Sequence, residues 1–216
     1  MTQSSVSSTN KSSISEKVKS LSPSGIRKFF DLISTMDNVI SLGVGEPDFV
    51  TPWRIREAAI YSIERGDTMY TSNYGLLDLR VAISEYLRDR HGLTYAADKQ
   101  VLVTVGISQA LDLAMRAILD PGDEVIIPEP TYVSYVPCVI LAGGVPVTVP
   151  THVENSFHVR PSDIESHITS KTKAILLGYP NNPTGAVMPR NELEKIAGIA
   201  KSYDLTVISD EIYERL

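Results

Sequence analysis

The chain has 216 residues, of which 43% are hydrophobic and 21% charged, and a formal net charge of −6. This balance is typical of a globular protein. The lack of a basic block argues against nucleic acid as a partner, and no apolar run approaches the roughly 20 residues that span a bilayer. The single cysteine, Cys138, predicts a reducing, cytoplasmic setting. The cysteine has no spaced partner and the histidines lack ligand spacing, so no metal site is expected, and no membrane contact is expected either.

Residues 1–21 are rich in serine and threonine, which predicts a flexible tail. A transit peptide is the alternative interpretation, but such peptides are rich in arginine and poor in acidic residues. Here the first arginine is Arg27, and Glu16 lies within the stretch. The tail is therefore favoured.

From Ser22 onward, prolines and glycines separate apolar runs of two kinds. Apolar residues three to four positions apart predict helices, whereas short runs rich in β-branched residues predict strands. In chain order, the predicted elements are helices at 54–64 and 75–90, a strand at 101–105, a helix at 108–119, a strand at 124–127, a helix at 133–141, strands at 145–149 and 173–177, a helix from 189 onward and a strand at 205–208.

Alternating strands and helices imply crossover connections, so we predict an α/β fold with a mostly parallel sheet and helices on both faces. In such sheets, ligands bind beyond the carboxyl ends of the strands. Four segments are expected at that edge: 106–109, 128–132, 179–185 and 209–213. Because the unusual residues of the chain fall in these segments, we predict one shared ligand site.

The segment Gly106-Ile107-Ser108 lies between a predicted strand and a predicted helix. Free amides at a helix start, the helix dipole and a serine hydroxyl together suit a phosphate group. A simple helix N-cap role for Ser108 is the alternative. A plain nucleotide-binding domain is disfavoured, because the G-x-G-x-x-G run of dinucleotide-binding folds is absent.

Two further segments offer an aromatic ring and a side-chain amide. Tyr132 follows two prolines, and its ring could lie flat on a planar ligand or belong to the core. In the segment 179–185, two prolines bracket two asparagines, so the amide of Asn182 would be aimed at a fixed point. The bond before Pro183 is a candidate for the cis form.

The last segment, Ser209 to Tyr213, begins at the end of a predicted strand. Carboxylates are seldom buried without a partner, so Asp210 predicts a cationic group beside it, such as a protonated pyridine nitrogen. Tyr213 could reach the same ring. The alternative is that Asp210 is a helix N-cap.

Motifs from about Ser22 to the last residue carry a family resemblance. They are Gly43-Val-Gly-Glu-Pro-Asp-Phe49 with Thr51-Pro52, Tyr70-x-x-x-Tyr74-Gly75, Val105-Gly-Ile-Ser-Gln-Ala-Leu111, Asp120-Pro-Gly-Asp-Glu-Val125, Asn182-Pro-Thr-Gly185 and Ser209-Asp-Glu-Ile-Tyr213. In this order they closely resemble the class I aminotransferases of the pyridoxal-phosphate-dependent fold-type I superfamily. The resemblance implies pyridoxal 5'-phosphate as cofactor and transfer of an amino group between an amino acid and a 2-oxo acid.

By this resemblance, the amides of Gly106 and Ile107 and the hydroxyl of Ser108 would hold the cofactor phosphate. Tyr132 would stack on the pyridine ring, at a position where some relatives have tryptophan.

Asn182 and Tyr213 would bond the phenolic oxygen of the ring, and Asp210 its nitrogen, so Asp210 and Tyr213 are the expected catalytic residues. Gly45 and Asn182 would contact the substrate. Tyr70 matches a residue that reaches the phosphate of a partner subunit, which implies a homodimer.

The resemblance also implies a domain organisation: a tail at 1–21, a small-domain and interface segment at 22–65, and an incomplete cofactor-binding large domain at 66–216. The family places its cofactor-bonding lysine after the segment that matches Ser209 to Tyr213. No lysine here stands in a matching position, so we expect the polypeptide alone to be inactive. The last predicted strand should be an interior strand of the family's sheet, so we also expect an open sheet edge there.

Two other functions share these motifs. A carbon–sulfur lyase of the same superfamily would use every segment above. A non-catalytic, aminotransferase-like binding module is the second alternative. Formation of pyruvate and ammonia, as opposed to amino-group transfer, would distinguish a lyase.

Overall fold

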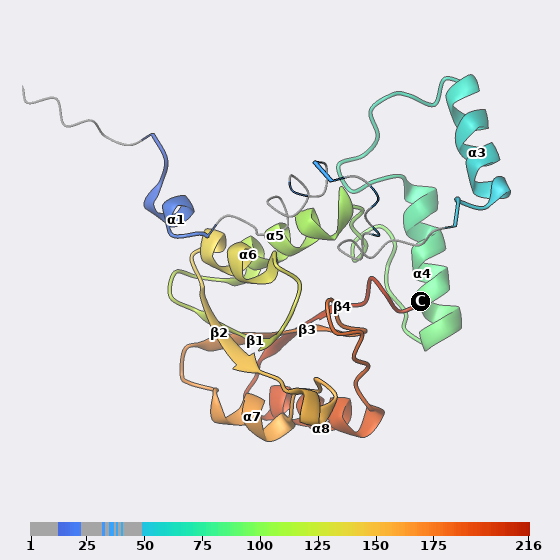
Figure 1. Ribbon diagram of the computed structural model, residues 1–216. Helices are drawn as coiled ribbons and strands as arrows, with labels where there is room; N and C mark the ends of the chain where they lie inside the picture. The colour runs from blue at the N-terminus through green and yellow to red at the C-terminus, as the bar shows by residue number, and fades with distance from the viewer. Residues whose placement is uncertain (1–12, 23–31, 33–34, 37, 39, 41–48) are drawn as a thin grey trace, which may run out of the picture. The chain divides into compact units, whose positions relative to one another are not determined.

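The computed structural model describes residues 13–22, 32, 35, 36, 38, 40 and 49–216 (Figure 1). The chain divides into two compact units. One comprises residues 24–106, and the other comprises residues 107–216 together with residues up to 23. The domain boundaries expected from the sequence remain a prediction.

The larger unit is built on a four-stranded sheet. Its strands are β1 (Glu124–Glu129), β2 (Val145–Pro150), β3 (Thr172–Gly178) and β4 (Thr206–Asp210). Their spatial order is β2-β1-β3-β4, and every neighbouring pair is parallel. Within the described residues, β4 forms an edge of the sheet, as expected, and the side chain of Val207 is 43% exposed there.

Helices cover both faces of this sheet (Figure 1). Helices α5 (Gly106–Ile118) and α6 (Tyr135–Ala142) pack on one face, and α7 (Pro161–Ser166) and α8 (Arg190–Ser202) on the other. The predicted α/β fold is therefore confirmed.

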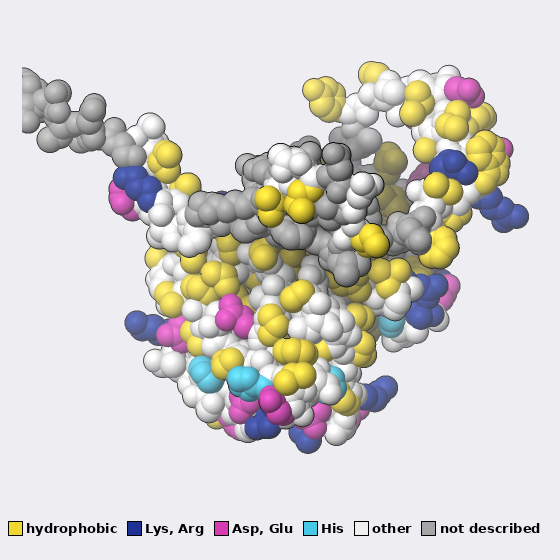
Figure 2. All heavy atoms as spheres, viewed as in Figure 1, with side chains coloured by type: hydrophobic (Ala, Val, Ile, Leu, Met, Phe, Trp, Pro, Cys, Tyr) yellow, Lys and Arg dark blue, Asp and Glu magenta, His cyan; other side chains and the backbone are white. Residues whose placement is uncertain are grey.

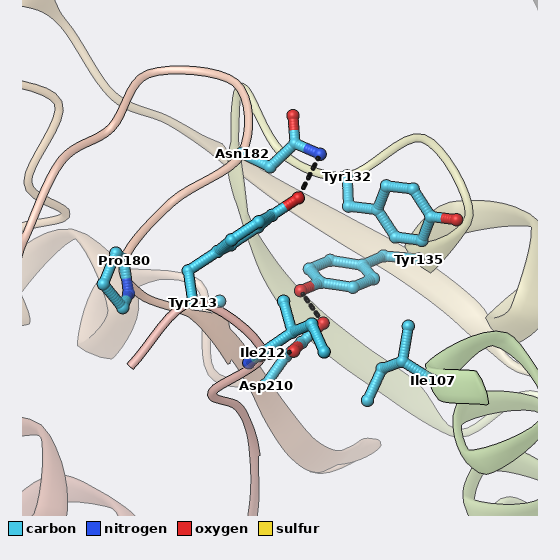
Figure 3. A pocket seen from close by; sticks show the side chains of 9 residues that line it. Ile107, Tyr132, Tyr135, Pro180, Asn182, Asp210, Ile212 and Tyr213 are labelled. Carbon is cyan, nitrogen blue, oxygen red and sulfur yellow. Dashed lines mark hydrogen bonds between the residues drawn. The ribbon is translucent and has the colours of Figure 1, made fainter. Parts of the chain in front are cut away.

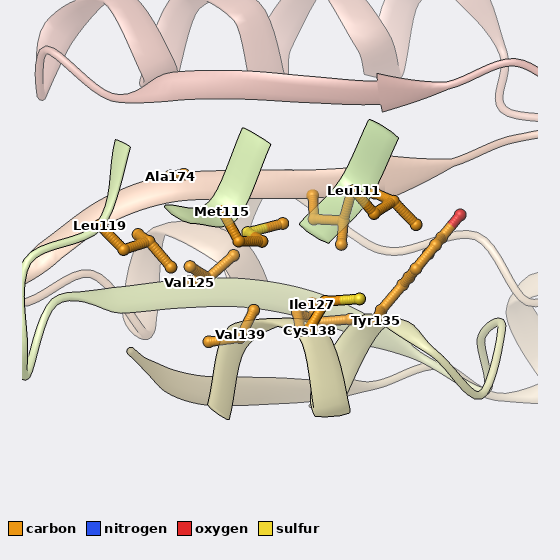
Figure 4. Packing of buried hydrophobic residues seen from close by; sticks show 10 residues of the cluster. Leu111, Met115, Leu119, Val125, Ile127, Tyr135, Cys138, Val139 and Ala174 are labelled. Carbon is orange, nitrogen blue, oxygen red and sulfur yellow. The ribbon is translucent and has the colours of Figure 1, made fainter. Parts of the chain in front are cut away.

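The buried side chains of the central strands alternate between these two layers. Val125 and Ile127 of β1 pack with Met115 of α5 and Val139 of α6 (Figure 4), whereas Ile126 packs toward α7 and α8. Successive side chains of a strand point to opposite faces, so a sheet covered on both sides needs continuous apolar runs. This explains why the two central strands contain unbroken apolar runs, Val125 to Ile127 in β1 and Ala174 to Leu177 in β3.

Short helices appear in stretches whose apolar residues show no clear periodicity. Helix α7 has six residues, begins with Pro161 and buries Ile164, and Val153–Asn155 forms a 3₁₀ turn. Within the stretch predicted as a tail, α1 (Glu16–Lys19) is capped by Ser15, whose hydroxyl accepts from the Val18 amide at 3.4 Å. Elements of one or two turns are too short to show a repeating apolar face.

The smaller unit contains α3 (Trp53–Glu64) and α4 (Leu77–His91), close to their predicted limits. Helix α3 buries none of its residues and exposes Trp53, Ile55, Ile60 and Ile63. Hydrophobic side chains gather on its surface in Figure 2, whereas the surface around α7 and α8 carries charged, histidine and hydrophobic side chains in a mixture.

The predicted strand at 101–105 is wrong. This run is not assigned to a strand, and Val105 is 88% exposed. Its backbone bonds instead to the loop before α4, where the Val103 amide donates to the Tyr74 carbonyl at 3.0 Å. β-Branched residues favour an extended chain, but a strand also needs a neighbour to pair with, and the described residues supply none here.

Gly75 allows this close approach. It has a φ of 91°, and an added Cβ would lie 2.5 Å from the Val103 Cβ. Any other residue would be strained in its backbone and would collide with Val103.

None of the helices within residues 13–22 and 49–216 combines the length and apolar character that a membrane span requires.

Candidate functional site

A cavity of about 150 Å³ opens in the larger unit at the carboxyl ends of β3 and β4 (Figure 3). Its lining comes from the segments that the sequence singled out, together with Tyr135, the first residue of α6, and Gly178, the last residue of β3. The residues that line it are Ile107, Tyr132, Tyr135, Gly178, Pro180, Asn182, Asp210, Ile212 and Tyr213. The predicted convergence of the segments on one hollow is therefore confirmed.

Asp210, the last residue of β4, lies at the base of the cavity and is only 5% exposed. Its Oδ2 accepts a hydrogen bond from the Tyr135 hydroxyl at 2.7 Å, and its Oδ1 accepts one from the Ile212 amide at 3.1 Å. Within the described part of the chain, both donors are neutral. The cationic partner expected for Asp210 is thus not among these contacts, and the carboxylate lines the cavity.

Asp210 does not cap a helix. Residues 212–215 form turns, and the Ile212 bond closes a local turn around the aspartate side chain. The N-cap alternative is therefore wrong, although the carboxylate does hold the chain that leads to Tyr213.

Tyr135 begins α6 and is 3% exposed. Burial of the phenol raises its pKa above the usual range, and the hydrogen bond to Asp210 and the charge of that carboxylate raise it further. The hydroxyl therefore keeps its proton and acts as a donor to Asp210.

Asn182 and Tyr213 meet on another side of the cavity (Figure 3). The Asn182 Nδ2 donates to the Tyr213 hydroxyl at 3.4 Å. The bond between Asn182 and Pro183 is cis, as predicted. These two side chains present an amide and a phenol toward the same space.

The neighbouring Asn181 holds the loop in place. Its Nδ2 lies 3.3 Å from the carbonyls of Pro130 and Gly178, and its Oδ1 accepts from the Thr184 amide at 3.1 Å and the Thr184 hydroxyl at 2.8 Å. Asn181 is therefore the structural asparagine of the pair, which leaves Asn182 available to the cavity.

The start of α5 contributes Ile107 to the lining of the cavity. Ser108, the next residue, is not part of the lining. The Ser108 hydroxyl lies 3.5 Å from that of Tyr132, whose ring packs edge-on against Tyr135 with centroids 5.7 Å apart. Because α5 begins at Gly106, Ser108 is its third residue, and the N-cap alternative is wrong. Amides in the first turn of a helix have no intrahelical acceptor and can bind an anion.

The remaining predicted site residues lie elsewhere. Gly106 is the first residue of α5, with a φ of 72°, and does not line the cavity. Tyr70 belongs to the smaller unit, where its side chain is exposed, and Gly45 lies outside the described residues.

Sequence reasoning missed Tyr135 and Gly178. A signal for Tyr135 existed, because a buried tyrosine usually finds a partner for its hydroxyl, but its partner lies 75 residues away along the chain. The described residues contain no cluster of His, Cys, Asp and Glu that could hold a metal ion.

A family model of aminotransferases of class I and II matches residues 37–216. The chain belongs to this family. A Bacillus subtilis protein named as an aminotransferase, YugH, is 56% identical over 203 residues, which cover 94% of this chain and 53% of that protein. The aspartate aminotransferase of Pyrococcus abyssi is 46% identical, with 93% of this chain and 52% of that protein covered.

Solved structures agree with this assignment. The aspartate aminotransferase from Thermus thermophilus with maleate superposes with a TM-score of 0.87 at 41% identity, over 93% of this chain and 53% of that one. The chain thus spans about half the length of the relatives that it matches.

The raised pKa of Tyr135 predicts a loss of stability at alkaline pH. The unfolded phenol titrates near pH 10, whereas the folded phenol keeps its proton to higher pH. Above about pH 10 only the unfolded chain releases this proton, so the free energy of unfolding falls by up to about 1.4 kcal/mol per pH unit. Urea denaturation of the wild type and of Tyr135→Phe at several pH values would measure this. The wild type should lose stability more steeply above pH 10, and parallel curves would contradict the assignment.

Proposed function

We propose that the cavity binds pyridoxal 5'-phosphate and that this chain provides cofactor-binding residues to an aminotransferase, which moves an amino group between an amino acid and a 2-oxo acid. The observation that carries the proposal is the buried Asp210 carboxylate, whose hydrogen-bond donors among the described residues are neutral and whose charge faces the cavity. A protonated heterocyclic nitrogen would supply the missing positive charge.

The chemistry of the other donors fits the same cofactor. Asn182 and Tyr213 would hydrogen-bond the phenolic oxygen of the ring, and the Tyr132 ring would stack on it. The amides of Gly106 and Ile107 and the hydroxyl of Ser108 would hold the phosphate at the start of α5. The carboxylate thus matches the ring nitrogen of the cofactor, the amide and the phenol match its phenolic oxygen, and the helix start matches its phosphate.

When bound, this cofactor supplies an electron sink for carbanion chemistry. The protein residues tune and orient it. Asp210 would hold a proton on the ring nitrogen. Each unit by which the carboxylate raises the pKa of that nitrogen corresponds to about 1.4 kcal/mol in favour of the protonated form. Tyr213 and Asn182 would fix the ring in its plane through their shared contact with its oxygen.

The names of relatives support amino-group transfer over the lyase alternative. They include an aspartate aminotransferase and an aromatic-amino-acid aminotransferase, the latter from Thermococcus litoralis and 44% identical. The proposed substrates are accordingly an amino acid and a 2-oxo acid, with Gly45 and Asn182 near the substrate carboxylate. These two relatives are named for different amino acids, one acidic and one aromatic.

A homodimer completes the proposed site. Tyr70 would reach the cofactor phosphate of the partner subunit. The exposed apolar residues of α3 (Trp53, Ile55, Ile60 and Ile63) support an interface, because a monomer rarely leaves such a patch in water. Residues 22–65 would then form the small-domain and interface segment, and residues 66–216 part of the large domain.

Replacing Asp210 by Asn should weaken cofactor binding. Pyridoxamine 5'-phosphate is the suitable probe, because it has no aldehyde to react with surface lysines. A hydrogen bond to a charged group contributes roughly 1.5–3 kcal/mol, so Asp210→Asn should weaken binding by about ten- to a hundred-fold in calorimetric titration.

Glu211→Gln is the matched control, because Glu211 is the next carboxylate along the chain and does not line the cavity. It should bind within about twofold of the wild type. Equal affinities for Asp210→Asn and Glu211→Gln would exclude the proposed role of Asp210.

The polypeptide of residues 1–216 should bind the cofactor without turning over substrate. Among the described residues, no lysine lines the cavity, and the loss of a general base typically costs about 10²- to 10⁴-fold in rate. The purified chain should therefore form no glutamate from 2-oxoglutarate with aspartate or phenylalanine as donor, measured by a coupled assay. Steady turnover by the pure chain would contradict this expectation.

A further inference from the structure

Three elements of the larger unit bring Tyr135, Gly178 and Asp210 together. Gly178 and Asp210 are register partners at the carboxyl ends of β3 and β4. Tyr135 comes from the start of α6, in the helical layer above the sheet, and its hydroxyl reaches Asp210 at 2.7 Å (Figure 3).

The absence of a side chain at Gly178 makes room for this bond. A Cβ added there would collide with the Tyr135 hydroxyl oxygen and would lie 3.2 Å from two carbons of the ring. The φ of Gly178 is not positive, so its backbone does not require glycine. The requirement is one of space.

Tyr135 has little freedom to avoid such a collision. Its ring is 3% exposed and belongs to the core cluster that includes Leu111, Cys138 and Leu176. In a close-packed core, displacing the hydroxyl means moving the ring and the residues around it. A side chain at position 178 would therefore push the hydroxyl away from Asp210.

The two donors to Asp210 fix the plane of its carboxylate. The terminal torsion of an aspartate is broad, so a carboxylate with one partner can rotate. Here Oδ1 is held by the Ile212 amide of its own turn, and Oδ2 by Tyr135 from another layer. Each oxygen keeps a further lone pair, which can accept a hydrogen bond from the cavity.

We propose that Tyr135 is a positioning residue for Asp210 and that Gly178 is the spacer that permits its contact. Resting on the proposed function, this inference means that the Tyr135 hydroxyl aims the carboxylate at the ring nitrogen of the bound cofactor. Gly178 also lines the cavity, and its proposed role is to leave room for the Tyr135 hydroxyl.

A double-mutant cycle on pyridoxamine 5'-phosphate affinity tests this coupling. Tyr135→Phe should weaken binding by about three- to tenfold, the range of a typical net hydrogen bond, and Gly178→Ala by at least as much. Because Gly178→Ala removes the same contact, the double variant should bind no more weakly than the weaker single variant.

Tyr179→Phe is the matched control. Tyr179 is also partly buried, and its hydroxyl bonds the Val159 amide and the Phe157 carbonyl, away from the cavity lining. It should bind within about twofold of the wild type.

A second measurement follows Tyr135 itself without cofactor. In chain labelled with ¹³C at the tyrosine ζ carbon, the Tyr135 signal, assigned by its loss in Tyr135→Phe, reports ionisation of the phenol. The ionisable groups near this phenol are Asp210, Tyr132 and Tyr213. Since the Asp210 contact helps to retain the proton, Gly178→Ala should shift the onset of Tyr135 ionisation to lower pH. The control Tyr179→Phe, which leaves this contact intact, should not shift it.

The outcomes separate this inference from the function on which it rests. No binding by the wild type would overturn the proposed function and the inference with it. Wild-type binding with an unaffected Tyr135→Phe, with additive effects in the double variant, or with an unchanged titration in Gly178→Ala, would overturn the inference alone.

Discussion

The site depends on one buried carboxylate. Asp210 is held in place by a phenol and a backbone amide, both neutral, while its charge faces a hollow at the end of the sheet. An ionised group buried without compensation is costly, so such an arrangement is typical of a place where a ligand supplies the opposite charge. The amide of Asn182, the phenol of Tyr213 and the start of α5 then define what else that ligand must offer.

The architecture explains why these groups meet. In a parallel sheet buried on both faces, the strands end at a common edge, and the loops that follow them are the parts free to carry polar residues. Asn181 and the turn after Asp210 use side-chain hydrogen bonds to hold those loops. The core beneath them, with Met115 and Ile127 fully buried, gives Tyr135 the fixed position from which it reaches across Gly178.

The sequence predicted the fold class, most element limits and the segments that converge, because apolar periodicity and loop residues are local signals. It also singled out Asp210, Asn182 and Tyr213 on the chemistry of their surroundings. It could not predict Tyr135 or Gly178, since their importance arises from a contact between α6 and the ends of β3 and β4. The strand expected at 101–105 failed for a related reason: propensity is local, whereas strand pairing needs a partner. The cofactor roles of the individual residues, including Tyr70 and Gly45, remain predictions.

The protonation state of the bound ring tests the central claim most directly. Pyridoxamine 5'-phosphate labelled with ¹⁵N in its ring reports by its chemical shift whether that nitrogen carries a proton. Bound to the wild-type chain above the pH at which the free ring nitrogen loses its proton, the nitrogen should remain protonated, and in Asp210→Asn it should not. A bound ring that is unprotonated in the wild type, or that is indifferent to the Asp210→Asn substitution, would contradict the account.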